Sequence, residues 1–136
     1  MTHKALHQYL ARVRAEPFRW GYHDCCMFAA NLYRDVYRID LAKGIRGKYR
    51  SPDGAERVIA EHGGLWKLIN DRTKAAGMVR VSPLQAQTGA IVLNKWKPTG
   101  WTVGIFDGRQ ALFISAGGLR GIPISHTRHA FQLCHS

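Results

Sequence analysis

Hydrophobic positions in the first half of the chain recur at the spacing of α-helices. Apolar side chains fall on one face of residues 3–15, which predicts an amphipathic helix that ends before Pro17. A second helix is expected from Asp24, because aspartate is a favourable N-cap residue and a wide apolar stripe follows it. The width of that stripe favours a central position for the second helix.

Two further helices are predicted before the pattern changes. Ser51 as the cap and Pro52 at the first helical position mark the start of one helix, which stops at Gly63-Gly64. The other helix is short and ends near Gly77.

The second half of the chain has short apolar runs separated by turn residues, which is the pattern of β-strands. The predicted strands are residues 78–81, 90–93, 103–106, 111–114, 119–124 and 131–133. Asp107-Gly108 and Gly117-Gly118 supply tight turns between them, so the strands are expected to form an antiparallel meander. Helices followed by a meander predict an α+β fold with a helix packed on the sheet.

The length of 136 residues is that of one domain, and we expect a single domain over residues 1–136. No apolar run approaches the roughly 20 residues that cross a bilayer, so no membrane span is expected. The first residues lack the apolar core of a signal peptide, which favours synthesis and folding in a cytoplasm.

The chain is strongly basic, with 20 Lys and Arg against 9 Asp and Glu and a net charge of +11. This balance favours an acidic partner, which could be nucleic acid, an anionic cell-wall polymer or a protein; a solvated basic surface is the alternative. Tyr49 lies within the basic segment 43–50 and could stack on a base. Because no helix-turn-helix, zinc finger or glycine-rich phosphate loop is visible, nucleic-acid binding is expected to be non-specific at most.

The candidate chemistry lies at Cys25, directly after the predicted cap Asp24. The N-terminus of a helix favours the thiolate form of a cysteine, and a cysteine nucleophile needs such a position. The alternative is that Cys25 packs as a small hydrophobic residue on the apolar stripe of its helix. Three cysteines, two of them adjacent, do not form a disulfide framework, so reduced thiols are expected.

The order of several motifs resembles the NlpC-like, papain-fold cysteine peptidases. The motifs are Trp20-Gly21, Asp24-Cys25, Gly89-Ala90-Ile91-Val92-Leu93 and Val103-Gly104-Ile105-Phe106-Asp107-Gly108. Residues 20–26 and 46–49 with Gly63-Gly64 are similar to a small branch encoded among phage tail genes. The resemblance implies an NlpC-type α+β fold, with N-terminal helices packed on a C-terminal antiparallel sheet.

Carried over residue by residue, the resemblance implies a nucleophile at Cys25 without its usual base. Thr102 stands where the family has its general-base histidine, and Ser115 is the nearest counterpart of the third polar residue. Ala90 stands where the family usually has an aspartate. Activation of a cysteine needs a base within hydrogen-bond reach, and threonine accepts no proton near neutral pH. Peptide cleavage by the family's mechanism is therefore not expected.

Another histidine could replace the missing base. His126, like His129, is near the C-terminal strand, and His23 lies two residues before Cys25. His23 could instead support its loop through hydrogen bonds. The soft metal ligands are His23, Cys25, Cys26, Cys134 and His135. They do not form the paired knuckles of a zinc site, so no metal and no cofactor is expected.

Two functions remain open at this point. The resemblance implies a structural or assembly protein of a phage tail tip, made in the host cytoplasm and bound to tail hub or tail-tip proteins. The alternative is an active cysteine hydrolase that cuts peptidoglycan peptides during infection. Trp96 and Trp101 flank a loop at residues 97–100 and either anchor a partner or cap the edge of the sheet.

Overall fold

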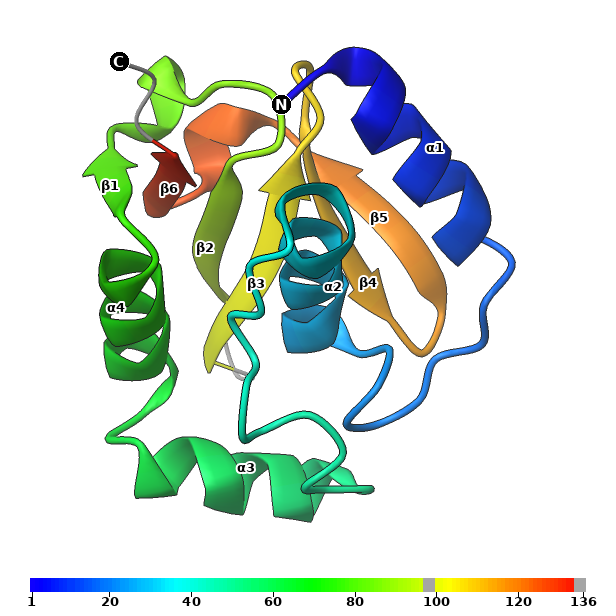
Figure 1. Cartoon of the computed structure of the whole chain (residues 1–136), viewed down its shortest axis with the longest axis vertical. Helices are drawn as coiled ribbons and strands as arrows, with labels where there is room; N and C mark the ends of the chain where they lie inside the picture. The colour runs from blue at the N-terminus through cyan, green and yellow to red at the C-terminus, as the bar shows by residue number, and fades with distance from the viewer. Residues whose placement is uncertain (97–99, 134–136) are drawn as a thin grey trace.

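The computed structural model describes residues 1–96 and 100–133, which form helices packed around one antiparallel sheet (Figure 1). The helices are α1 (His3–Val13), α2 (Cys25–Tyr37), α3 (Pro52–Glu61) and α4 (Leu65–Ala75), with two short 3₁₀ helices at Pro83–Gln85 and Ile124–His126. The strands are β1 (Met78–Val81), β2 (Ile91–Trp96), β3 (Gly100–Phe106), β4 (Ala111–Ser115), β5 (Gly118–Ile122) and β6 (His129–Leu133). The predicted α+β class, with helices first and strands second, is confirmed.

The strand order is β1-β6-β2-β3-β4-β5. Strands β2 to β5 form the predicted meander, but β6 lies between β1 and β2, so the expectation of a meander throughout is wrong. Met78 pairs with Leu133 on one side of β6, and Ile91 pairs with Phe131 on the other. The strand predicted over residues 119–124 ends at Ile122, because Pro123 has no N–H to give to the sheet.

Side-chain caps set the starts of three helices. The Thr2 hydroxyl accepts a hydrogen bond from the N–H of Ala5, and the Ser51 hydroxyl accepts one from the N–H of Gly54. The Asp24 carboxylate caps α2 in the same way. The predicted helix starts at Asp24 and Ser51 are therefore confirmed.

Helix α2 crosses the middle of the sheet, as its wide apolar stripe predicts (Figure 1). Phe28 and Leu32 are fully buried against Val103 and Ile105 of β3. The Tyr9 hydroxyl donates to the carbonyl of Phe28 at 2.6 Å and so joins α1 to the first turn of α2. This packing holds the start of α2 beside the first residues of β3. Among the described helices, none is long and apolar enough to span a membrane.

Candidate active site at the start of helix α2

Asp24 is the buried anchor of this site, with 1% of its surface exposed. One carboxylate oxygen accepts from the N–H of Met27 at 2.9 Å, which caps the helix. The other accepts from the N–H of Gly21 at 2.8 Å and from the Tyr49 hydroxyl at 2.6 Å. Burial, together with the charge of Asp24, raises the pKa of Tyr49 far above its usual value. Tyr49 is therefore a buried structural residue, and the suggestion that it stacks on bases is wrong.

Two loops that carry the sequence resemblance meet at this anchor. The N–H of Gly47 donates to the carbonyl of Gly21 at 3.0 Å. A Cβ at Gly21 would collide with the carbonyl oxygen of Tyr49, and a Cβ at Gly47 would lie 2.9 Å from the Tyr22 hydroxyl. Both glycines also have positive φ angles, 84° and 74°. The close contact of the two loops therefore requires glycine at both positions.

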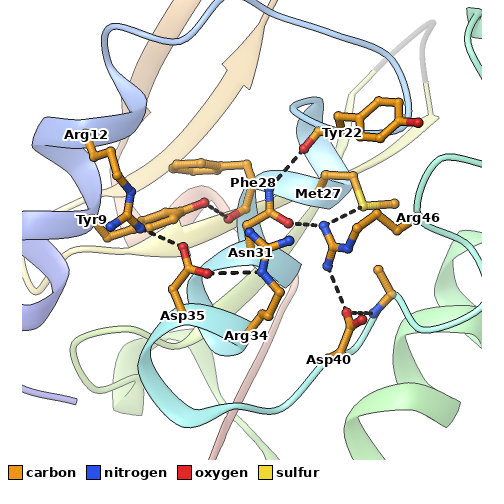
Figure 2. Close-up of polar contacts among 11 residues, drawn as sticks. Tyr9, Arg12, Tyr22, Met27, Phe28, Asn31, Arg34, Asp35, Asp40 and Arg46 are labelled. Atoms are coloured by element: carbon orange, nitrogen blue, oxygen red, sulfur yellow. Dashed lines mark hydrogen bonds and ion pairs between the residues drawn. The ribbon is translucent and has the colours of Figure 1, made fainter.

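A polar chain extends the anchor along α2 (Figure 2). The guanidinium of Arg46 donates to the Asn31 side-chain oxygen and, at 2.8 Å, to the Asp40 carboxylate. The Asn31 amide in turn donates to the carbonyl of Tyr22 at 2.9 Å. Burial raises the pKa of Asp40, but the hydrogen bonds from Arg46 and from the N–H of Ala42, together with the nearby positive charges, outweigh burial, so the pKa is lowered. Arg46, which lies in the basic segment 43–50, thus binds internal partners.

Cys25 is the first residue of α2 and is half-buried. Its sulfur lies 3.9 Å from the sulfur of Cys26. The hydrogen bond with the Cys26 side chain lowers the pKa of Cys25 most, against burial and the Asp24 charge, and a hydrogen bond from the Thr102 hydroxyl lowers it further. The same contact and burial raise the pKa of Cys26. Cys25 is therefore the more acidic thiol of the pair, in the position that a nucleophile would need.

The position of the missing base is close to this thiol. Thr102 of β3 lies opposite Asn94 of β2 and is near enough to hydrogen-bond with Cys25. Within residues 1–96 and 100–133, no imidazole forms a hydrogen bond with the Cys25 sulfur. Ser115 is exposed at the end of β4, where its hydroxyl accepts from the N–H of Gly117 at 3.2 Å. The cysteine thus has a hydroxyl neighbour at the place of a general base.

The candidate substitute bases lie in different surroundings. His23 is 3% exposed, and its backbone exchanges two hydrogen bonds of 2.8 Å with Arg19. Neither ring nitrogen of His23 has a hydrogen-bond partner in the described chain, and the nearest carboxylate oxygen, of Glu16, is 4.0 Å away. Its backbone therefore supports the loop while its ring does not. His126 is exposed in the second 3₁₀ helix. A catalytic role for either histidine stays a prediction.

His129 packs among aromatic rings. Its imidazole lies 4.3 Å from the Trp66 ring and 5.6 Å from the Trp101 ring. Burial, followed by the charge of Arg80, lowers the pKa of His129. Trp101 pairs with Lys95 in the β2–β3 hairpin, and successive residues of a strand point to opposite faces of the sheet. Trp96 therefore lies on the opposite face from Trp101, where its ring is 5.0 Å from the ring of Phe113. Both tryptophans are half-buried, and most of the loop between them, residues 97–99, lies outside the described residues.

Three potential metal ligands come together here. Atoms of Asp24, Cys25 and Cys26 lie within 4.8 Å of one another. The oxygens of Asp24 already accept three hydrogen bonds, so two thiols remain. A structural zinc ion takes four ligands, and this group does not supply them. Cys134 and His135 lie outside the described residues, and the expectation of no metal stays a prediction.

Comparison with solved structures defines the class of fold. The crystal structure of the NlpC/p60 domain of the peptidoglycan hydrolase SagA matches with a TM-score of 0.61 over 98% of this chain and 100% of that chain. Sequence identity is 16%, so the match shows an NlpC-like, papain-type fold. No curated protein sequence matches the chain. The family named DUF6950, a domain of unknown function, matches residues 2–133, and the chain belongs to this family.

Proposed function

We propose that the chain is a structural or assembly protein of a phage tail tip that keeps an NlpC-like fold without peptidase chemistry. The observation that carries the proposal is the surroundings of the Cys25 sulfur, where Thr102 contributes to the lowered pKa and no imidazole of the described residues forms a hydrogen bond. Cleavage of an amide needs a group that takes the thiol proton and returns it to the leaving amine. A threonine hydroxyl does neither near neutral pH.

The rest of the site supports a scaffolding role. Asp24 and the two glycine loops hold the start of α2 through buried hydrogen bonds that involve no substrate. These loops are the segments whose sequence is similar to the branch encoded among phage tail genes. The net charge of +11 supports docking on acidic tail hub or tail-tip proteins. In this proposal the protein is made in the host cytoplasm and ends in the virion tail tip.

Complementation of a phage that lacks the gene tests the proposal. The deletion is expected to block tail assembly, and a plasmid copy carrying Cys25→Ala is expected to restore infectious particles to the level of the unchanged copy. The melting temperature of each purified variant controls for folding. If a normally folded Cys25→Ala protein fails like the deletion, or if intact tails form without the chain, the scaffolding role is wrong.

An active cell-wall hydrolase is the second candidate, and one observation favours it. The pKa of Cys25 is lowered, as a reactive thiol requires, through hydrogen bonds from Cys26 and Thr102. In that case a substitute base completes the site, and His23 and His126 are the candidates. Activity on peptidoglycan that disappears in His126→Ala or in His23→Ala, with the fold retained, would identify that base.

A further inference from the structure

Strand β5 forms one edge of the sheet. It pairs with β4 on one side, and no described strand pairs with its other side (Figure 1). An unpaired edge presents a row of free backbone N–H and C=O groups to any extended chain that approaches. Natural edges are often blocked by proline or lysine, yet β5 reads Gly-Leu-Arg-Gly-Ile and has neither.

The register of the β4–β5 hairpin shows which backbone groups are free. Ser115 pairs with Gly118 across a two-residue turn, so these two form the first hydrogen-bonded pair. Bonded and non-bonded pairs alternate along an antiparallel ladder. Leu119 and Gly121 therefore direct their N–H and C=O groups away from β4, toward the open edge.

A groove of about 580 Å³ runs beside the same two residues. The lining combines apolar and charged residues, among them Val13, Arg14, Glu16 and Phe18 at and after the end of α1, and Asp107, Leu112, Leu119 and Gly121 from the sheet and its β3–β4 loop. A volume of this size is typical of ligand sites in proteins. The amide end of the Gln110 side chain lies over Gly121, where an added Cβ would come within 2.4 Å of it, so Gln110 must move for a side chain to enter at this point. A strand added to β5 would direct alternate side chains into this groove.

The charge of Arg120 on β5 favours some partner strands over others. Arg120 points to the opposite face from Leu119, is exposed, and lies with its guanidinium 5.6 Å from the centre of the Trp96 ring. It forms no ion pair within the part of the chain that the structure describes. Like charges on neighbouring strands repel, so a second copy of this basic chain is a poor partner and a strand with carboxylates is a good one.

We propose that β5 is extended by an acidic, extended segment of a partner protein, which adds to the sheet as a further strand. Main-chain hydrogen bonds to Leu119 and Gly121 hold it, small or apolar side chains enter the groove, and carboxylates lie beside Arg120. Addition of a strand to an open edge is a known mode of peptide recognition. This surface does not include Cys25, so the inference goes beyond the proposed function and does not depend on whether the cysteine is catalytic.

Titration with a synthetic dodecapeptide of alternating valine and glutamate tests the proposal, with a valine–lysine peptide as the matched control. The first peptide is expected to bind and to protect the amides of Leu119 and Gly121 from hydrogen exchange, and the second is expected not to bind. Leu119→Pro removes one free N–H and is expected to weaken binding by about tenfold or more. Leu119→Ala keeps that N–H but removes an apolar side chain from the groove, so it is expected to weaken binding less than Leu119→Pro does. Arg120→Glu should reverse the preference between the peptides.

Two controls keep the test decisive. Circular dichroism and thermal unfolding show whether Leu119→Pro is folded. If it is not, protection of the Leu119 and Gly121 amides in the unchanged chain still tests whether the peptide adds to β5. Absence of binding, equal binding of both peptides, or protection elsewhere in the chain would overturn the proposal. So would a dimer in sedimentation that Leu119→Pro abolishes, because the edge would then pair with a second copy.

Discussion

At the scale of single residues, Asp24 determines the geometry of the site. Its carboxylate receives a helix N–H, a loop N–H and a tyrosine hydroxyl, all in a buried environment. Each donor would lose its partner if the carboxylate were removed. In the sequence, the Asp-Cys pair indicates a nucleophile. In the structure, Asp24 of this pair joins two loops to the start of a helix.

Asp24→Ala is expected to lower the free energy of unfolding by about 3 kcal/mol, because it removes a cap and leaves buried donors without partners. Urea denaturation measures the change. Asp53→Ala is the matched control, since Asp53 lies exposed in the first turn of α3 and is not its cap; we expect a loss within about 0.5 kcal/mol. Equal losses in the two variants would contradict the anchoring role.

The two adjacent thiols are expected to titrate separately. Because hydrogen bonding with Cys26 lowers the pKa of Cys25, alkylation by iodoacetamide should begin at Cys25 at a lower pH than at Cys26. Cys26→Ala removes that hydrogen bond, so the pKa of Cys25 rises and its alkylation profile moves to higher pH. Peptide mapping by mass spectrometry follows each site. A profile that Cys26→Ala leaves unchanged would show that the pairing of the thiols has no such effect.

At the scale of elements, the loops at residues 19–24 and 46–49 act as one unit. Gly21 and Gly44 test this, because both have φ angles near +80° but differ in their surroundings. Gly44→Ala meets no atom within 4 Å and should cost about 1 kcal/mol from backbone strain alone. Gly21→Ala also collides with the Tyr49 carbonyl and should cost about 1–3 kcal/mol more. Similar unfolding free energies for the two variants would mean that the loops separate at little cost.

Local signals predicted most of the elements. Asp24 and Ser51 mark helix starts because caps act within three residues. Asp107-Gly108 and Gly117-Gly118 mark the two hairpins, but the observed loops are residues 107–110 and 116–117, because Phe106 pairs with Ala111 and Ser115 with Gly118. The place of β6 between β1 and β2 depends on pairing across more than thirty residues of chain, which no local pattern specifies. The end of β5 at Ile122 could have been predicted, because Pro123 follows it.

The sequence also predicted part of the candidate site, namely the residues that belong to local motifs. Cys25 and Thr102 follow from motif order, and the structure adds that Thr102 contributes to the lowered pKa of Cys25. The hydrogen bonds from Tyr49 to Asp24 and from Arg46 to Asn31 join segments far apart in sequence. Polar partners at such separations leave no periodic signal, so only the folded chain reveals them.

At the scale of the whole molecule, the chain combines an NlpC-like fold with a basic surface and an open sheet edge. The fold accounts for the cysteine at the start of a central helix, and Thr102 stands where our proposal expects acid–base chemistry to be missing. The charge and the edge of β5 are the features to which our proposals assign binding. We propose a protein that combines an NlpC-like fold with a surface that holds partners.

Release of peptides from purified peptidoglycan, measured by mass spectrometry, tests this account most directly. The unchanged chain is expected to release no more peptide than Cys25→Ala, because no base acts on the thiol. Thr102→His, which places an imidazole at the position of Thr102, is the informative companion variant. Release by the unchanged chain that Cys25→Ala abolishes would contradict the account and establish the protein as a cysteine hydrolase.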